Sequence, residues 1–151
     1  MHTMSVLLAT DGSPEALSAA EWLDRWAMPE HIEVTVATVI VPPSMTWAAG
    51  SAGMTMDGEI YARTYKEIIE EERTAATEAL SATRAQLVNC PPAKEEILTG
   101  APAKVLVDYA KTHHIDLIVM GRRGHSALGN LMGSVSFGVL QRSPVPVTIV
   151  S

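Results

Sequence analysis

Short apolar runs alternate with helix-forming segments along the whole chain. The runs that predict strands lie at residues 5–10, 32–41, 94–98, 115–120 and 145–150. They are rich in β-branched residues or almost continuously apolar, which is typical of strands buried on both faces of a parallel sheet. Alternation of strands and helices predicts an α/β fold in which right-handed crossovers join parallel strands.

The segments between these runs carry helix signals. Ser13-Pro14 opens the first helix, because serine suits an N-cap and proline suits the first helical position. A long helix is predicted over residues 59–88, where apolar residues recur at helical spacing. Two further helices are predicted, one that opens at Pro102 and one over residues 131–141.

Length, charge and cysteine content restrict the class of protein. With 151 residues, of which 47% are hydrophobic, the chain is predicted to form one domain, residues 1–151. A net charge of −6 argues against a nucleic-acid partner and against docking on an anionic membrane. We expect no membrane span, because no apolar run approaches roughly 18 residues. Without a signal-peptide pattern, and with Cys90 as the single cysteine, the chain is expected to be cytoplasmic.

Two of the predicted strands end in residues that suit a ligand. Ala9-Thr10-Asp11-Gly12-Ser13 follows the first strand, and Met120-Gly121-Arg122-Arg123-Gly124 follows the fourth. In parallel sheets, ligands bind beyond the carboxyl ends of strands, where the strand order reverses. Glycines allow a close approach of the backbone, and a helix start such as Gly133-Ser134 points N–H groups at an anion. Together these segments predict a crevice that binds phosphates.

The order of these segments resembles that of the universal stress protein family over essentially the full length of the chain. The matching stretches are Ala9-Thr10-Asp11-Gly12-Ser13, Gly100-Ala101-Pro102, Asp116 to Gly124, Gly133-Ser134-Val135-Ser136 and Pro144 to Val150. The resemblance implies a three-layer α/β sandwich, adenine nucleotide alpha hydrolase-like, with a five-stranded parallel sheet of order 3-2-1-4-5. It also implies a homodimer joined through the last strand, Val145 to Val150, and ATP binding in one branch of the family.

That branch has the motif Gly-x2-Gly-x9-Gly-Ser/Thr, which implies roles for matching residues here. The residues implied to hold phosphates and ribose are Gly121, Gly124, Gly133 and Ser134. Those implied to lie beside the adenine are Asp11 and Val39. Further candidates in the same segments are Thr10, Met120, Arg122, Arg123, His125, Val135 and Ser136. Magnesium would enter with the phosphates, and no metal site is expected from protein side chains alone.

The chain departs from the motif in one spacing. Eight residues, 125–132, separate Gly124 from Gly133, where the motif has nine. Either the shorter loop is harmless, or it rotates the start of the last helix and misaims Ser134. Plainer interpretations of the other candidates also stay open: a turn role alone for Asp11, solvated loop charges for Arg122 and Arg123, and an exposed loop position for His125.

These features predict a dimeric, ATP-binding sensor or regulator of the stress response that acts on an unknown protein partner. The long loop at 44–58 is the candidate segment for a nucleotide-dependent change. No catalytic cycle is expected, because no nucleophile–base pair or Walker loop is present, although slow hydrolysis of bound ATP stays open. The alternative is an interaction dimer of the same fold that binds no nucleotide. A nucleotide α-hydrolase enzyme ranks last, because residues 9–13 lack a Ser-Gly-Gly-x-Asp-Ser-like loop.

Overall fold

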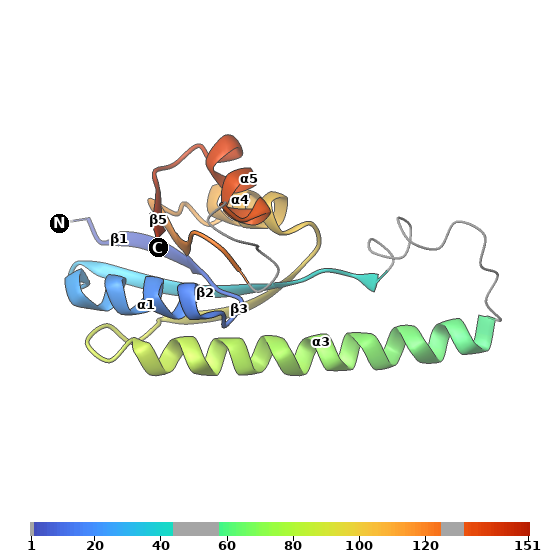
Figure 1. The fold of residues 1–151 in the computed structure, drawn as a ribbon. Coiled ribbons are helices and arrows are strands. Elements are labelled where there is room, and N and C mark those ends of the chain that lie inside the picture. Colours follow the sequence, from blue (N-terminus) through green and yellow to red (C-terminus); the bar gives the residue numbers. More distant parts are fainter. Residues whose placement is uncertain (1, 44–57, 125–131) are drawn as a thin grey trace.

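Strands and helices alternate along the chain in the computed structural model, which describes residues 2–43, 58–124 and 132–151. The elements labelled in Figure 1 are β1 (Met4–Ala9), α1 (Pro14–Trp26), β2 (Ile32–Ile40), α3 (Gly58–Gln86), β3 (Lys94–Thr99), α4 (Pro102–Thr112), β4 (Leu117–Gly121), α5 (Ser134–Arg142) and β5 (Val147–Val150). The predicted alternation is therefore confirmed. Apart from its last residue, the predicted loop at 44–58 lies outside the described residues.

The strands form a single parallel sheet of order β3-β2-β1-β4-β5. This confirms the predicted order 3-2-1-4-5. The central strand, β1, pairs with β2 on one side and with β4 on the other, so that Ala9 is the register partner of both Ala37 and Met120. The chain winds outward from β1 in one direction and then returns to β4, which makes the carboxyl ends of β1 and β4 the switch point.

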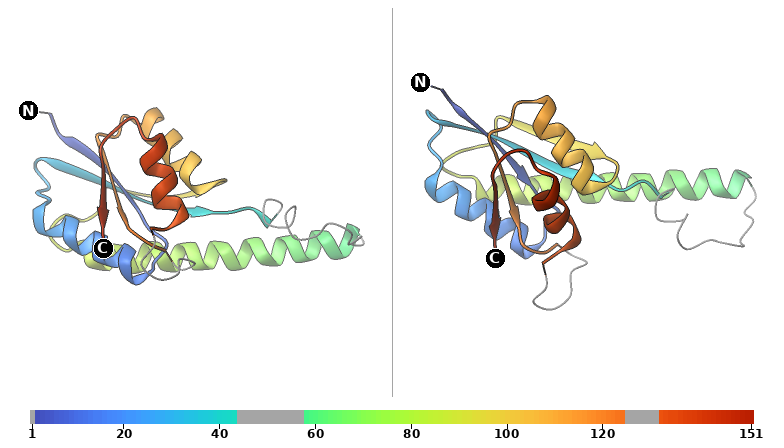
Figure 2. Two further views of the ribbon diagram at one scale, coloured as in Figure 1. Left: turned by 45° about the horizontal axis from the view of Figure 1, so that its top comes forward. Right: turned by 90° about the horizontal axis from the view of Figure 1, so that it is seen from above.

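Helices cover both faces of this sheet. In Figures 1 and 2, α1 and α3 lie on one face and α4 and α5 on the other. Alternate residues of β1 serve the two layers: Val6 and Leu8 belong to the core beneath α1 and α3, whereas Leu7 and Ala9 belong to the core beneath α4 and α5. This double burial explains why the strand is continuously apolar from Val6 to Ala9. The structure is thus the predicted three-layer sandwich.

Among the described residues of α3, the buried ones all lie in the second half of the helix. Its buried residues are Ala76, Ala79, Leu80 and Thr83. The first half, from 58 to 75, has no buried residue and extends well past the sheet (Figure 2). The acidic residues 70–72 are exposed, as their position on the solvated side of the predicted helix indicated.

The last helix and the last strand both begin later than the sequence pattern predicted. Gly133 has extended backbone angles and is the N-cap of α5, so that the helix starts at Ser134 and not at 131. The strand β5 starts at Val147 and not at 145, because Pro146 has no N–H group to donate to a neighbouring strand. Both differences lie at element ends, where sequence periodicity carries little information.

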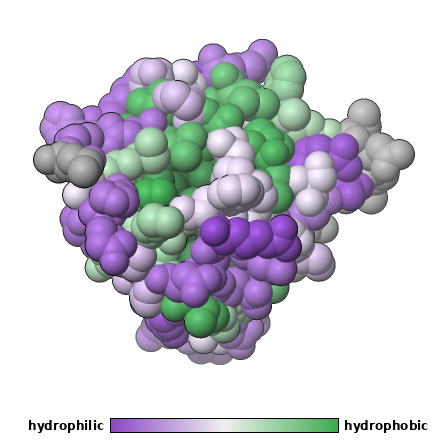
Figure 3. Space-filling model, turned by 90° about the vertical axis from the view of Figure 1, so that its left-hand side faces the viewer, coloured by the Kyte–Doolittle hydropathy of each residue, from purple (hydrophilic) through white to green (hydrophobic). Residues whose placement is uncertain are grey.

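The amino end of the sheet carries exposed apolar side chains. Those at or beside this end are Met4, Trp26, Met28 and Val88. Figure 3 views this end of the molecule, and green apolar groups gather in the upper half of the face above more polar ones. Among the helices of the described ranges, none combines the length and apolar character that crossing a membrane requires.

Candidate functional site

A pocket opens at the carboxyl ends of β1, β2 and β4. Its empty volume is about 690 Å³, which includes the open solvent at its mouth. The predicted site residues that line it are Thr10, Asp11, Val39, Met120, Gly121, Arg123, Gly124, Ser134, Val135 and Ser136. Of the other described candidates, Arg122 and Gly133 lie beside the pocket without lining it. His125 lies outside the described residues.

Several lining residues were not among the sequence candidates. They are Ala9, Ala16, Ala37, Thr38, Pro102 and Leu106. The strand order was a usable signal for Ala37, because it places β2 next to β1 and pairs this residue with Ala9. Leu106 is buried on α4, and only the packing of that helix over the sheet brings it to the site. All of these residues except Thr38 add apolar surface to the pocket lining.

The loop after β1 is held in a tight turn. The Asp11 carboxylate accepts the Ser13 N–H at 2.9 Å, and the Thr10 hydroxyl accepts the Gly12 N–H at 3.1 Å. Gly12 has φ of +77°, a conformation that glycine adopts without strain. Ser13 caps α1 by accepting the N–H of Ala16 at 3.3 Å, as predicted. The turn role of Asp11 is confirmed, and its contact with a nucleotide stays a prediction.

The two glycines of the second loop allow close contacts within the protein. A Cβ added to Gly121 would lie 2.8 Å from the carbonyl carbon of Glu15 and 3.0 Å from the amide nitrogen of Ala16. A Cβ added to Gly124 would collide with the Asp11 carboxylate. The loop after β4 thus lies directly against the first turn of α1 and the Asp11 turn. The sequence predicted that the backbone at Gly121 comes close to a ligand. In the structure it comes close to the first turn of α1.

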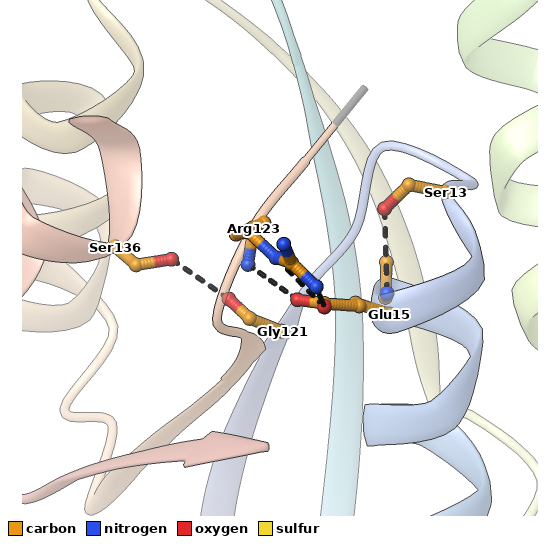
Figure 4. Close-up of polar contacts among 6 residues, drawn as sticks. Ser13, Glu15, Gly121, Arg123 and Ser136 are labelled. Carbon is orange, nitrogen blue, oxygen red and sulfur yellow. Dashed lines mark hydrogen bonds and ion pairs between the residues drawn. The ribbon is translucent and has the colours of Figure 1, made fainter. Parts of the chain in front are cut away.

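The start of α5 is joined to the same loop. The Gly133 N–H donates to the Arg122 carbonyl at 2.9 Å. The Ser136 hydroxyl donates to the Gly121 carbonyl at 2.7 Å, as Figure 4 shows. Ser134 lines the pocket together with Gly121, so the eight-residue spacing does not turn this residue away. Gly133 offers no side-chain cap, and the first N–H groups of α5 lie at the positive end of the helix dipole beside the pocket.

Arg123 is engaged by a carboxylate that sequence reasoning did not identify. Its Nε and Nη2 atoms donate to Glu15 Oε1 at 2.9 and 2.5 Å, and its backbone N–H donates to Glu15 Oε2 at 2.8 Å (Figure 4). The side chains of Arg123 and Glu15 are only 28% and 19% exposed, so Arg123 is not a solvated loop charge. The hydrogen bonds from Arg123 hold the pKa of Glu15 below its usual range, and the same contact raises the pKa of Arg123.

Arg122 has a different environment from its neighbour. Its backbone N–H donates to the Val150 carbonyl at 2.8 Å, which joins the loop to the end of β5. Its Nε atom is buried and has no hydrogen-bond partner among the described residues. Within the same described ranges, no group of three or more histidine, cysteine or acidic side chains is placed to hold a metal ion.

The comparison with protein families agrees with this geometry. The model of the universal stress protein family matches residues 3–151. The chain belongs to the universal stress protein family. Among curated relatives, a universal stress protein of Mycolicibacterium smegmatis is 30% identical over 146 residues, covering 96% of this chain and 47% of the relative. One from Thermus aquaticus is 29% identical over 148 residues, which cover 97% of each chain. The chain therefore spans about half the length of the mycobacterial relative.

Solved structures of universal stress proteins share the fold. UspA from Lactobacillus plantarum superposes with a TM-score of 0.78 at 23% identity, covering 100% of this chain and 99% of that one. A universal stress protein in complex with cAMP has a TM-score of 0.58 at 28% identity, with 99% and 98% covered. The universal stress protein from Archaeoglobus fulgidus in complex with dAMP has a TM-score of 0.63 at 22% identity, with 100% of each chain covered.

Proposed function

We propose that this universal stress protein binds an adenine nucleotide in the pocket at the carboxyl end of its sheet. The observation that carries the proposal is that three segments far apart in sequence line this pocket together. They are the Asp11 turn, the Gly121 to Gly124 loop and the start of α5 at Ser134. Support comes from two family members of the same fold whose structures contain cAMP and dAMP.

The pocket lining combines apolar side chains with polar groups. Val39, Met120 and Leu106 provide apolar surface for the adenine, and Asp11 provides an acceptor for a base or ribose group. The N–H groups at the start of α5, with the adjacent glycine loop, would face the phosphates. These residues fit the ATP that the sequence motif implies, with Mg²⁺ entering on the phosphate oxygens. Such an ion would neutralise phosphate charge, and the protein would supply binding and orientation.

We further propose that the protein acts as a dimeric regulator of the stress response in the cytoplasm, without a dedicated catalytic cycle. In this proposal, nucleotide occupancy alters the surface presented to a regulatory protein partner. Support for the homodimer comes from β5, which ends the sheet order and pairs with β4 on one side. On the adjacent helix α5, Phe137 and Leu140 are 53% and 41% exposed, so this edge carries apolar surface for a second copy.

A direct test is to analyse the protein for nucleotide that remains bound during purification. Denaturing the protein releases any ligand, and chromatography of the supernatant identifies it by its absorbance near 260 nm and its retention time. We expect an adenine nucleotide in the supernatant, or saturable uptake of one after stripping. Failure of ATP, AMP and cAMP alike to bind the stripped protein would favour the alternative, an interaction dimer of this fold that binds no nucleotide.

A further inference from the structure

The Glu15 carboxylate accepts three hydrogen bonds from Arg123. Both carboxylate oxygens are used, one by the Nε and Nη2 atoms and the other by the backbone N–H of Arg123. The charge of Arg122 also contributes to lowering the pKa of Glu15. Glu15 lies in the first turn of α1, where the helix dipole favours a negative charge. The carboxylate of Glu15 is therefore stabilised both by Arg123 and by the positive end of the α1 dipole.

This pair leaves the pocket short of positive charge. Among the described residues that line it, the charged ones are Asp11 and Arg123, and the charge of Arg123 is balanced by Glu15. The sequence of the two stretches outside the description, 44–57 and 125–131, contains no lysine or arginine. A phosphate-rich ligand would thus meet backbone N–H groups and a helix dipole, but no uncompensated lysine or arginine from the described lining.

We propose that Glu15 is the internal counter-anion of Arg123 and thereby sets the phosphate charge that the site accepts. The wild-type site then prefers an adenosine that carries a single phosphate group and accepts ATP only when Mg²⁺ neutralises part of the triphosphate. This inference rests on the proposed nucleotide-binding function and adds a charge selectivity to it. Each further phosphate adds negative charge close to Glu15 and Asp11, which weakens binding unless a cation compensates.

Charge variants at the two positions test the proposal by sign. The Glu15–Arg123 pair contributes no net charge in the wild type, one positive charge in Glu15→Gln, one negative charge in Arg123→Gln, and none in the double variant. Glutamine keeps an oxygen that can accept the Arg123 N–H, so the first variant changes charge with little change of shape. Glu21→Gln is the matched control, because Glu21 lies on the same helix in an exposed pair with Arg25.

The measurement is the ratio of ATP affinity to AMP affinity, obtained by calorimetry in EDTA at low ionic strength. We expect the wild type to bind AMP more tightly than metal-free ATP. Glu15→Gln raises the ratio by about ten-fold, the effect of one charge on several phosphate charges at partly screened distance. Arg123→Gln lowers it, the double variant returns it toward the wild-type value, and Glu21→Gln leaves it unchanged. Saturating Mg²⁺ reduces these differences.

The outcomes separate this inference from the function on which it rests. Circular dichroism first establishes that each variant is folded. If one single variant is unfolded, the other single variant and the double variant still test the proposal. Equal ATP-to-AMP ratios in the wild type and Glu15→Gln overturn the charge selectivity but leave nucleotide binding standing. A loss of affinity for both nucleotides in all three pair variants, without the change of sign, would show a purely structural pair. No binding of any nucleotide by the wild type overturns both proposals.

Discussion

The hydroxyl oxygens of Thr10 and Thr83 lie 2.8 Å apart in a buried seam between the loop after β1 and α3. Thr83 donates to the Ala79 carbonyl at 2.7 Å, so Thr10 is the donor between the two hydroxyls. Thr10 in turn accepts the N–H of Gly12, where an added Cβ would lie only 3.1 Å from the Cα of Ala79. This chain of hydrogen bonds connects the lining of the pocket at the carboxyl end of the sheet to the long helix that extends beyond the sheet.

Replacing Thr83 by valine tests the contribution of this contact. The substitution keeps the side-chain shape but leaves the buried Thr10 hydroxyl without its acceptor, which typically costs about 1–2 kcal/mol. We expect the free energy of unfolding, measured in urea, to fall by that amount. Thr77→Val is the control, because Thr77 makes the same bond to the carbonyl four residues earlier on the exposed side of α3. Equal effects of the two substitutions would contradict the account.

The Glu15–Arg123 pair predicts a pH dependence of stability. Because the pKa of Glu15 is lowered in the folded state, its stabilising contribution is present above the pKa of an unfolded glutamate and is lost as the pH falls through the lowered value. The stability gap between wild type and Glu15→Gln is therefore widest near neutral pH and closes in acid. Urea midpoints at a series of pH values measure the gap. A gap that stays constant down to pH 3 would contradict the ion pair.

Much of the fold was predictable because its signals are local. The apolar strands, the Ser13 cap and the prolines that open α1 and α4 each mark an element by its own residues. The rule for ligand sites in parallel sheets also predicted that the Asp11 turn and the Gly121 to Gly124 loop lie at one edge, where Gly124 does lie against the Asp11 carboxylate.

The Glu15–Arg123 pair was not predictable in this way. These residues are 108 positions apart, and no local pattern distinguishes Glu15 from any other acidic residue in the first turn of a helix. The same limit applies to Leu106, whose place at the pocket depends on how α4 packs over the sheet. The predicted range 131–141 begins before α5 even though Gly133-Ser134 was also predicted as a helix start, because a glycine inside an apolar helical pattern does not show whether it belongs to the helix or caps it.

Cys90 is expected to be unreactive in the folded protein. Its side chain is 1% exposed, and burial together with the charges of Asp24 and Glu30 raises the pKa of the thiol. The thiolate, which is the reactive form, is therefore scarce and inaccessible near neutral pH. A colorimetric thiol reagent at pH 8 should label the native protein far more slowly than the urea-unfolded protein. Labelling of the native protein at the unfolded rate would contradict this burial.

The edge of β5 predicts self-association. Pairing of Val147–Val150 with a second copy would satisfy the strand edge and cover Phe137 and Leu140 of α5. Light scattering after size exclusion should give twice the mass of the 16.2 kDa chain. Phe137→Glu should shift the mass toward one chain, whereas Val88→Glu, at the opposite end of the sheet and 75% exposed, should not. A single-chain mass for the wild type would contradict the dimer.

Calorimetric titration of the stripped protein with ATP and Mg²⁺ tests the central claim most directly. The account predicts saturable binding, with one nucleotide per chain. It also predicts that Ser134→Glu, which places a negative charge at the start of α5 inside the pocket, removes most of the affinity without unfolding the protein. Absence of measurable heat with ATP and Mg²⁺, and equally with AMP and cAMP, would contradict nucleotide binding at this pocket.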